Sequence, residues 1–424
     1  MRVLVVGAGG REHALAWALA GSPLLTKLWV APGNPGTAEL AENVPIGTLD
    51  IAALVDFARS NAVDLVVPGP EAPLVAGIAD AMGMAGIACC GPSAAAARLE
   101  GSKSFAKEIC AAAVIPTARW ERFDDPAAAR EFVRRRGAPI VVKADGLAAG
   151  KGVVVAASVA EAEVAIEQFM QARTLGAAGD AVVIEECLIG DEISLFALCD
   201  GTHAIPLGAA QDHKRIGEGD TGPNTGGMGA YGPPPALSPA LAEAAMARVI
   251  RPAIAELARQ GTPFRGILFA GLMLTEDGPK LIEFNVRLGD PEAQCLLPRL
   301  QSDLLPALLA ACDGELGQFA LRFTDQAALA VVLAARGYPG EVAQHLPLGD
   351  LGAAAALPGV LVFQGATERR DGKLLSTGGR VLTVCGTGPD LQAAHAAAYR
   401  GVAAVATPEL YFRRDIGARA LPPR

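Results

Sequence analysis

The stretch RVLVVGAGGREHALAW, residues 2–17, constrains the fold more than any other part of the chain, because an apolar strand runs through glycines directly into a helix. A strand, a glycine turn and a helix in this order start a parallel α/β unit such as those that bind dinucleotides. The dinucleotide fingerprint also needs a third glycine and, about 20 residues on, an acidic residue for the ribose hydroxyls. Glu12 stands at the third glycine position, and no carboxylate follows the next strand before Glu39. We therefore expect this fold without a nicotinamide or flavin.

The glycine turn itself leaves two interpretations open. Backbone N–H groups at a helix N-terminus favour a phosphate or carboxylate, and Arg11 adds a positive charge beside Gly9 and Gly10. A tight turn that binds no ligand would use the same glycines. The spacing alone does not choose between an anion site and a plain turn.

Short apolar runs alternate with helical patterns up to about residue 100, which predicts an open, mostly parallel sheet. The predicted strands are 3–7, 28–33, 64–71 and 88–93, with helices at 11–22 and 50–60 and one serine-capped helix within 91–109. Ligands of such sheets bind at the carboxyl ends of the strands. We therefore expect a ligand near the glycine- and proline-rich turns that follow these strands.

The pattern changes twice after residue 100. Residues 120–190 predict a small α+β subdomain with strands at 138–145, 152–158 and 181–188 and a helix at 158–172. The next part predicts a strand at 192–201, a loop at 211–235, a helix near 238–260, and strands at 266–275 and 279–287. The tail from about 328 predicts a compact unit with strands at 327–335, 359–368 and 380–388 and a helix near 390–406.

Composition excludes several classes of protein. The 424 residues suffice for about three domains, and 51% of them are hydrophobic. A net charge of −9 argues against binding to nucleic acid or to a membrane surface. No apolar run is long enough to span a membrane, and the start lacks the pattern of a signal peptide, so we expect a cytoplasmic protein. Eight cysteines without a C-x-x-C pair indicate neither a zinc ribbon nor a disulfide framework.

A second glycine-rich run, VVKADGLAAGKGVVV (residues 141–155), lies between two predicted strands. A hairpin that only turns needs roughly two to five residues, but this loop runs from Ala144 to Gly152. It also carries Lys151 between Gly150 and Gly152. Flexible N–H donors with an ammonium group predict a lid over phosphates; a plain hairpin is the alternative. The run does not fit the P-loop pattern.

Two lysines precede this lid. Lys143 follows Val141 and Val142 on a strand that reads as buried, where a lysine requires an anionic partner. An exposed strand lysine is the alternative. Lys103 lies on the helix after Gly101-Ser102, where taken alone it reads as a surface lysine.

The segment VVIEECLIGDEISL places Glu185 and Glu186 at a strand end and Glu192 after a short turn. A solvated acidic turn would have this pattern. The backbone from Glu186 to Leu188 could equally read adenine through N–H and C=O groups, with Glu192 accepting from ribose hydroxyls. Spacing alone does not decide.

The most informative segment is PKLIEFNVRLGDPE. Alternate residues of a strand share a face, and this rule assigns the residues to two faces: Leu281, Glu283, Asn285 and Arg287 on one, and Ile282, Phe284 and Val286 on the core face. The oxygens of Glu283 and Asn285 suit Mg²⁺, which takes one or two carboxylates and shares its other positions with phosphates and water. Arg287 could clamp a phosphoryl or carboxylate group. A solvated strand face is the alternative.

The loop at 211–235 completes the candidate site. Long loops in compact domains are usually functional or disordered, and this one begins with the dense polar run Asp212-His213-Lys214-Arg215. We interpret His213 as a surface or hydrogen-bonding residue rather than as a metal ligand or base.

These segments together resemble the ATP-grasp ligases, and more specifically the phosphoribosylamine–glycine ligase family. The resemblance rests on GGREHALAW, PGPEAPL, LEGSK, KADGLAAGKGV, QDHKR, DTGPNTGGMGAY, IEFN, R-x-GDPE and GGRVL, which occur from end to end of the chain. It implies an N-terminal Rossmann-like open parallel sheet over residues 1–102, an ATP-grasp region over 103–327 with a small lid subdomain at about 121–190, and a small C-terminal α+β domain over 328–424.

The resemblance also implies the reaction. ATP, glycine and 5-phosphoribosylamine would give glycinamide ribonucleotide, ADP and phosphate through a glycyl phosphate, in purine biosynthesis. A glycine-rich lid and a long covering loop would keep the acyl phosphate from water. Mg²⁺ or Mn²⁺ and cationic donors would stabilise the transferred phosphoryl group.

Roles carry over from the family by position. Metal ligands would be Glu283 and Asn285. ATP would be held by Lys103, Lys143, Gly150, Lys151, Gly152, Glu185, Glu186, Leu188 and Glu192. The phosphoribosylamine and glycine sites would be lined by Gly9, Gly10, Asp212, Lys214, Asn224, Thr225 and Gly226, with Arg287, Gly289 and Asp290 at the carboxyl phosphate. Arg287, Lys143 and Asp212 would be catalytic.

Ala8 departs from the family pattern, which often has an asparagine before the two glycines, and this puts a contact to the sugar phosphate in doubt. The resemblance further implies a monomer, with a transient contact to the enzyme that supplies the unstable amine. Three rival functions stay open at this point: another ATP-grasp ligase, a nucleotide sensor without turnover, and an NAD-dependent oxidoreductase. Glu12 and the missing ribose acid oppose the last.

Overall fold

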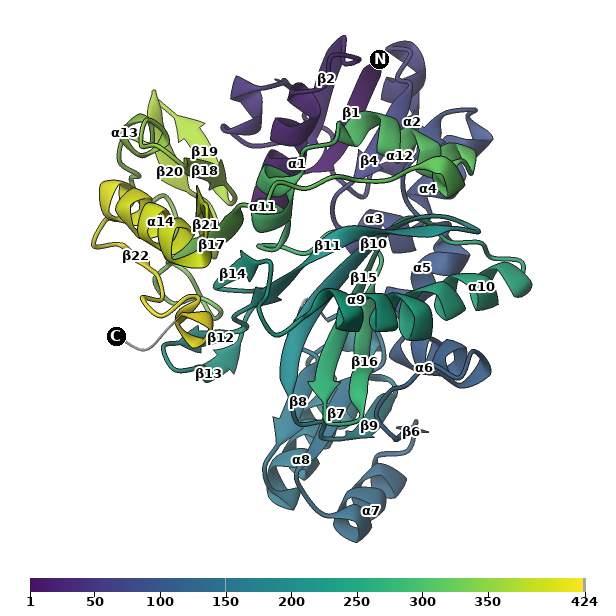
Figure 1. Ribbon diagram of the computed structural model, residues 1–424. Helices are drawn as coiled ribbons and strands as arrows, with labels where there is room; N and C mark the ends of the chain where they lie inside the picture. Colours follow the sequence, from purple (N-terminus) through teal and green to yellow (C-terminus); the bar gives the residue numbers. More distant parts are fainter. Residues whose placement is uncertain (149, 422–424) are drawn as a thin grey trace.

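The computed structural model describes residues 1–148 and 150–421. Its N-terminal part is a parallel sheet in the order β3-β2-β1-β4-β5, shown in purple in Figure 1. The strands are β1 (Arg2–Gly7), β2 (Lys27–Pro32), β3 (Glu42–Asn43), β4 (Leu65–Pro68) and β5 (Ala88–Cys89). Both faces of β1 are covered, because Leu4 and Val6 pack into one apolar core while Val3 and Val5 pack into another. The predicted open parallel sheet is confirmed.

The helices of this part are α1 (Gly10–Ala20), η1 (Thr37–Glu39), α2 (Ile51–Ser60), α3 (Glu71–Val75) and α4 (Ile78–Met84). The single helix predicted within 91–109 is in fact two, α5 (Ala94–Gly101) and α6 (Lys103–Ala112). Ser102 separates them because its backbone is extended and its Oγ accepts from the Phe105 N–H at 3.2 Å, which caps α6. The break places Lys103 at the first residue of α6 instead of inside a helix.

Residues 120–186 form a small lobe at the bottom of Figure 1. Its antiparallel sheet has the order β6-β9-β7-β8, with β6 (Trp120–Phe123), β7 (Ile140–Ala144), β8 (Val153–Ala156) and β9 (Val182–Glu186). The helices α7 (Pro126–Arg136) and α8 (Val159–Ile166), the π-helical turn η2 (Glu167–Gln171) and η3 (Gly176–Gly179) complete it. Val133, Val142, Ile166 and Ile184 belong to an apolar core of its own.

A second, larger sheet connects the remaining parts in the order β16-β15-β10-β11-β14-β17-β21-β18, with β22 paired to β17. Its strands are β10 (Asp191–Asp200), β11 (Ala204–Asp212), β14 (Gly229–Gly232), β15 (Arg265–Thr275), β16 (Gly278–Asn285), β17 (Ala327–Ala335), β18 (Val360–Gln364), β21 (Arg380–Gly388) and β22 (Leu410–Tyr411). The tail from about 328 therefore has its own apolar core but continues this sheet, because β17 pairs with β14.

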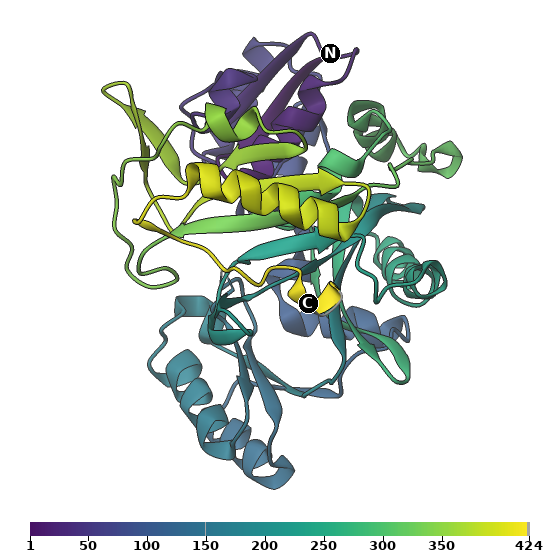
Figure 2. The ribbon, with the colours of Figure 1, turned by 60° about the vertical axis from the view of Figure 1, so that its left-hand side comes forward.

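Helices cover this sheet on several sides. They are α9 (Pro239–Ala245), the π-helical turn η4 (Met246–Ile250), α10 (Arg251–Arg259), α11 (Ala293–Leu296), η5 (Leu297–Arg299), α12 (Leu304–Asp313), η6 (Leu316–Gln318), α13 (Gly352–Ala355), α14 (Leu391–Val405) and η7 (Ala418–Ala420). Figure 2 shows α14 lying across the strands of the C-terminal part. Across the described ranges, none of the helices is both long and apolar enough to cross a membrane.

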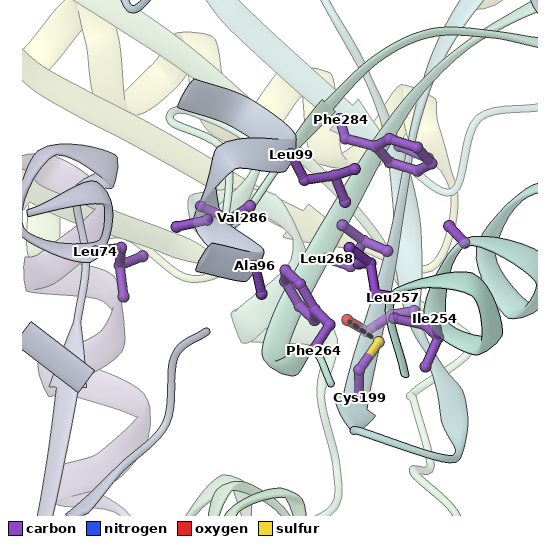
Figure 3. Close-up of a cluster of buried hydrophobic side chains, with 14 of the residues drawn as sticks. Leu74, Ala96, Leu99, Cys199, Ile254, Leu257, Phe264, Leu268, Phe284 and Val286 are labelled. Carbon is purple, nitrogen blue, oxygen red and sulfur yellow. Dashed lines mark hydrogen bonds between the residues drawn. The ribbon is translucent and has the colours of Figure 1, made fainter. Parts of the chain in front are cut away.

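An apolar cluster behind β16 fixes the orientation of that strand. Leu99 of α5, Leu257 of α10, Leu268 of β15 and Phe284 of β16 pack together, as Figure 3 shows. Burial of a side chain such as Phe284 contributes about 1.5–3 kcal/mol, so the register of β16 is strongly specified. Its neighbours in sequence then face away from this core.

The segment at 211–235, predicted as a loop, contains regular structure. It holds β14 and a separate two-stranded hairpin of β12 (Arg215–Gly217) and β13 (Thr221–Asn224). A second such hairpin, β19 (Thr367–Arg370) with β20 (Lys373–Ser376), lies in the C-terminal part. Glycine and proline content concealed these strands, because each is short and none alternates cleanly between apolar and polar residues.

Candidate active site

A cavity of about 700 Å³ lies where the small lobe, α5 and α6, the large sheet and the β12–β13 hairpin meet. Most residues that the sequence assigned to the site line it: Lys103, Lys143, Gly150, Gly152, Glu185, Glu186, Leu188, Glu192, Asp212, Lys214, Asn224, Thr225, Gly226, Glu283, Asn285, Arg287 and Asp290. Lys151 is exposed and is not part of this lining, and Gly289 is buried behind it.

A second cavity, of about 490 Å³, opens at the carboxyl ends of β1 and β2. Gly9, Gly10 and Asn34 line it on the side of the parallel sheet, and Asp290 and Arg380 line both cavities. Ligand sites were expected at these strand ends. The two cavities are therefore neighbours that share one acidic and one basic side chain.

The glycine turn of the second cavity is already in contact with an internal carboxylate. The Gly9 N–H donates to Glu12 Oε2 at 2.6 Å, and Glu12 Oε1 accepts from Arg11 Nε at 2.6 Å. The carboxylate at the third glycine position thus satisfies one amide of the predicted anion cradle. A contact between Gly9 and a phosphate stays a prediction, and it requires Glu12 to move aside.

Two buried lysines share one carboxylate beside the main cavity. Glu185 places Oε2 3.1 Å from Lys143 Nζ and Oε1 3.1 Å from Lys107 Nζ, and all three side chains are about 4% exposed. Burial lowers the pKa of Lys107, although Glu185 acts in the opposite direction. Lys143 has the anionic partner expected for a buried strand lysine. Sequence reasoning missed Lys107, which looks like an ordinary helix lysine.

A bulge in β16 supplies a further ligand to Lys143. Glu283 pairs with Gly271 but Leu281 pairs with Leu272, so Ile282 is the extra residue. Its carbonyl oxygen accepts from Lys143 Nζ at 3.0 Å. The predicted strict alternation was therefore wrong at this point: Leu281, not Ile282, belongs to the buried core cluster.

Glu283 and Asn285 lie on the cavity side of β16. Burial acts to raise the pKa of the Glu283 carboxyl, but the positive charges of Lys214, Lys143 and Lys103 outweigh it and lower the pKa. The carboxylate is therefore ionised when the cavity is free of ligand. Burial also lowers the pKa of Lys103, which Glu283 partly opposes.

Arg287 was expected on the same strand, but β16 ends at Asn285 and Arg287 lies in the bend that follows. Its guanidinium still reaches Asn285, donating from Nη2 to Oδ1 at 3.1 Å. It also contacts Glu100 at 2.8 Å and Glu71 at 3.3 Å. Both acids were missed as site residues; Glu71 carried a usable signal, since it lies three residues after the carboxyl end of β4, in the turn where a ligand was expected.

A dense group of charges lies opposite β16. Lys214 pairs with Glu192, and Ser194 Oγ donates to Glu292 Oε1 at 3.1 Å. Burial raises the pKa of Asp212 to about 8, with Lys214 opposing and Glu292 and Glu192 reinforcing. Burial likewise raises the pKa of Glu292, a residue that sequence reasoning missed. Gly289 has no room for a side chain, since a Cβ would lie 2.3 Å from Glu292 Oε2.

The edge predicted for adenine is partly engaged within the protein. The Glu186 N–H donates to the Arg119 carbonyl at 3.0 Å, and Arg119 Nε donates to the Glu186 carboxylate at 2.7 Å. Leu188, Met273 and Val155 add apolar lining at this end of the cavity. An apolar wall beside a strand edge is a surface on which a purine base can bind.

The β12–β13 hairpin forms the opposite wall. Thr225 Oγ1 donates to the Lys214 carbonyl at 2.8 Å, and the Gly226 N–H donates to Tyr338 Oη at 3.0 Å. The glycine-rich loop rests on this wall, since a Cβ on Gly150 would lie 3.6 Å from the Thr225 oxygen. His213 is buried and its Nε2 accepts from the Gly417 N–H at 3.3 Å. It is a hydrogen-bonding residue, as expected.

The residues present fit a magnesium ion that is bound together with a nucleotide. The described part of the chain contains no group of three or more His, Cys, Asp or Glu side chains placed to hold a metal ion alone. Glu283 and Asn285 offer one ionised carboxylate and one amide oxygen, which is the sparse oxygen set that Mg²⁺ uses when phosphates and water supply its other ligands.

Comparisons with known proteins agree with this geometry. Family models for the N domain, the ATP-grasp (A) domain and the C domain of phosphoribosylglycinamide synthetase match residues 1–100, 101–293 and 328–419. A phosphoribosylamine–glycine ligase of Brucella melitensis is 53% identical over 421 residues, covering 99% of this chain and 98% of the relative. One of Escherichia coli is 46% identical over 429 residues, covering 99% of each.

Solved structures show the same relationship. The crystal structure of phosphoribosylamine–glycine ligase from Thermotoga maritima matches with a TM-score of 0.86 at 32% identity, over 98% of this chain and all of the other. The biotin carboxylase domain of a Hydrogenobacter thermophilus 2-oxoglutarate carboxylase, solved with MgADP, matches with a TM-score of 0.72 at 16% identity, over 97% of this chain and 91% of the other. That second likeness shows the fold alone. By its sequence and by its structure, this chain belongs to the phosphoribosylglycinamide synthetase family.

Proposed function

We propose that the chain uses ATP to ligate glycine to 5-phosphoribosylamine, giving glycinamide ribonucleotide, ADP and phosphate in purine biosynthesis. The observation that carries the proposal is the pair of cavities that meet at Asp290 and Arg380. One cavity is large, with an apolar slot and a lysine cluster suited to ATP. The other lies at strand ends and a helix N-terminus, where a sugar phosphate is favoured.

The chemistry proceeds in two displacements. A glycine carboxylate oxygen attacks the γ-phosphorus of ATP, so that ADP leaves and glycyl phosphate forms. The amine nitrogen of phosphoribosylamine then attacks the acyl carbon, phosphate leaves with its electron pair, and the nitrogen loses a proton. Lys103, Lys143 and Lys151 would hold the phosphates, and Arg287 would stabilise the carboxyl phosphate. Mg²⁺ bound by Glu283 and Asn285 would neutralise charge on the phosphoryl oxygens.

The glycine end lies at Asp212 in this proposal. An ionised Asp212 would accept hydrogen bonds from the glycine ammonium, while Asn224, Thr225 and Gly226 frame the substrate. Glu185 would frame adenine together with Glu186 and Leu188, and its carboxylate would also keep Lys143 and Lys107 in place, since it lies 3.1 Å from each ammonium group. Glu186 and Leu188 would bind adenine. Glu192 would bind the ribose once its ion pair with Lys214 is broken.

An assay of ADP release tests this function. Continuous ADP release over many turnovers should require both glycine and phosphoribosylamine. ADP release with another small acid but not with glycine would replace this function with that of a different ATP-grasp ligase. Binding of ATP with no turnover under any combination would indicate a nucleotide sensor instead.

Finer expectations belong to the same proposal. Mn²⁺ should replace Mg²⁺, because it also accepts hard oxygen ligands. We also propose that the chain works in the cytoplasm as a monomer and receives its unstable amine through a transient contact with the supplying enzyme. Light scattering after size exclusion, with and without substrates, measures the oligomeric state.

A further inference from the structure

The β12–β13 hairpin carries cavity residues but has little support of its own. Within the described parts of the chain, its two strands pair only with each other, through Arg215 with Asn224 and Gly217 with Thr221. An isolated two-stranded hairpin is at best marginally stable in water. Yet this hairpin and the residues after it place Arg215, Asp220, Asn224, Thr225 and Gly226 in the cavity lining. Something outside the hairpin must hold it.

The support comes from residues 411–415, near the end of the chain. Tyr411 Oη donates to the Ile216 carbonyl at 3.0 Å, and the Arg414 N–H donates to Glu218 Oε1 at 3.1 Å. The Gly219 N–H donates to Asp415 Oδ2 at 2.8 Å. Segments almost 200 residues apart in sequence are thus joined by consecutive hydrogen bonds.

Arg413 is the centre of this contact. It is 1% exposed, although arginine is almost never buried without partners. One side of its guanidinium makes a two-point contact with Asp415, at 2.8 and 2.7 Å. Nη1 reaches across to the hairpin, 3.0 Å from the Arg215 carbonyl and 2.8 Å from Asp220 Oδ1. Arg413 and Asp415 therefore contact the hairpin at Arg215 in β12 and at Gly219 and Asp220 in the turn.

The hydrogen bonds of this cluster favour the charged forms of both Arg413 and Asp415. Burial acts to lower the pKa of Arg413, but hydrogen bonds to Asp415 and Asp220 raise it, so the guanidinium remains charged. Burial opposes ionisation of Asp415, but Arg413 and the Gly219 N–H lower its pKa to about 2. A planar guanidinium can make these contacts at fixed angles, which a lysine cannot reproduce.

We propose that Arg413 is a positioning residue for the substrate site: it anchors the β12–β13 hairpin and thereby holds Asn224, Thr225 and Gly226 against the cavity. This inference rests on the proposed function, in which these hairpin residues bind glycine and the amine. Nothing in the sequence motifs pointed to residue 413, which lies more than 100 positions along the sequence from every predicted site residue.

A positioning role and a general destabilisation predict different results for the substrates. If Arg413 positions the hairpin, its substitution should change the binding of glycine or phosphoribosylamine but not that of the nucleotide. Lys143 lies on β7 of the small lobe, and Leu188 lies two residues after β9. Glu185 and the Ile282 carbonyl hold Lys143 in place, and neither of them belongs to the hairpin. Loosening the hairpin should therefore leave nucleotide affinity nearly unchanged. The KM for glycine or phosphoribosylamine should rise, because their binding residues lose their fixed position.

The test compares Arg413→Met with the neighbouring Arg414→Met, since Arg414 is exposed and uses its backbone N–H, which the substitution keeps. We expect Arg413→Met to raise the KM for glycine or the amine about tenfold, with ADP affinity by calorimetry changed less than about twofold. Arg413→Lys should restore part of the loss, and Arg414→Met should behave as wild type. Unchanged KM values in a folded Arg413→Met protein, or an equal loss of ADP affinity, would overturn the proposal.

A variant at Asp220 and the hydrogen exchange of the hairpin amides test the same anchor in other ways. If Arg413→Met does not fold, Asp220→Ala removes the hairpin-side carboxylate that Arg413 and Arg419 both contact, and it keeps the Arg413–Asp415 pair; unchanged KM values there count against the anchor. Hydrogen exchange of the 215–224 amides needs no activity and should become faster in both variants. If the wild-type protein is inactive with glycine, the proposed function fails. Hydrogen exchange would still show whether Arg413 anchors the hairpin.

Discussion

Glu283 is surrounded by the ammonium groups of Lys103, Lys143 and Lys214, whose charges lower the pKa of its carboxyl. In the proposed function, these ammonium groups are the cationic donors for the phosphates of ATP, and Glu283 is the carboxylate for the metal ion. We expect Glu283→Gln to reduce kcat/KM for ATP by at least about 100-fold, because a ligand of the metal and the negative charge are both lost.

The matched control is Glu276→Gln, since Glu276 is exposed in the turn between β15 and β16. Kinetics as a function of Mg²⁺ concentration, together with thermal unfolding, check the prediction. Near-normal turnover in Glu283→Gln would remove Glu283 as a ligand.

Asp212 provides a prediction on pH. Its pKa is raised to about 8 by burial, while the proposed contact with the glycine ammonium needs the ionised form. In the free enzyme the ionised fraction therefore increases as the pH rises through about 8. We expect kcat/KM for glycine to rise over the same range, and Asp212→Asn to lower it and flatten the profile. A wild-type profile that is flat from pH 6.5 to 9 would contradict this role.

Single residues were predicted from the sequence where a local pattern marked them. Glu283, Asn285 and Lys143 each stand out against apolar neighbours on a strand. Lys107 and Glu292 gave no such signal, because their role exists only through partners distant in sequence, such as Glu185 and Ser194. Tertiary packing brings these groups together, and a single sequence does not encode the contact in any local pattern.

In the proposed function, the glycine-rich loop binds the phosphates of ATP through its backbone. Gly150 has a φ of +78°, a conformation that costs a residue with a Cβ roughly 1–2 kcal/mol. We expect Gly150→Ala to raise the KM for ATP about five- to tenfold, because the loop no longer settles over the phosphates. Gly47→Ala is the control, since a Cβ at Gly47 would meet nothing within 4 Å. Equal KM values in the two variants would show that the loop conformation is unimportant.

At the level of elements, the sequence predicted most strands and several helices but not their irregularities. The strands 327–335 and 380–388 match β17 and β21 residue for residue. The break at Ser102 was missed although Gly101-Ser102 is itself a helix-stop and N-cap signal, because a helical pattern lies on both sides of it. The bulge at Ile282 was missed because alternation cannot show an extra residue. Both irregularities lie next to the site: one places Lys103 at a helix start, and the other exposes a carbonyl to Lys143.

The whole molecule is held together across its parts by buried polar contacts. His13 of α1 accepts from the Gln364 N–H at 2.9 Å and packs edge-on against Phe363, so it joins the first sheet to the C-terminal part. The continuity of the large sheet through β14 and β17 adds a second connection. Neither was predictable, because no local pattern specifies which distant strands pair.

This contact predicts sensitivity to acid. Burial lowers the pKa of His13 from 6.5 to about 4. Between these values the unfolded chain binds a proton that the folded chain does not, so stability is lost as the pH falls from 6.5 to 4, by up to ~1.4 kcal/mol per pH unit. His13→Asn should show a smaller loss in urea unfolding over this range. An identical pH dependence in both proteins would show that His13 does not contribute.

At the scale of the whole molecule, we propose that the two neighbouring cavities serve one reaction. Glycine is activated as glycyl phosphate, and its glycyl group is transferred to the amine. The most direct measurement uses glycine labelled with ¹⁸O in its carboxylate and follows the label by mass spectrometry. Each phosphate released should carry one ¹⁸O, since a glycine oxygen leaves with the phosphoryl group. Formation of glycinamide ribonucleotide with unlabelled phosphate would contradict it.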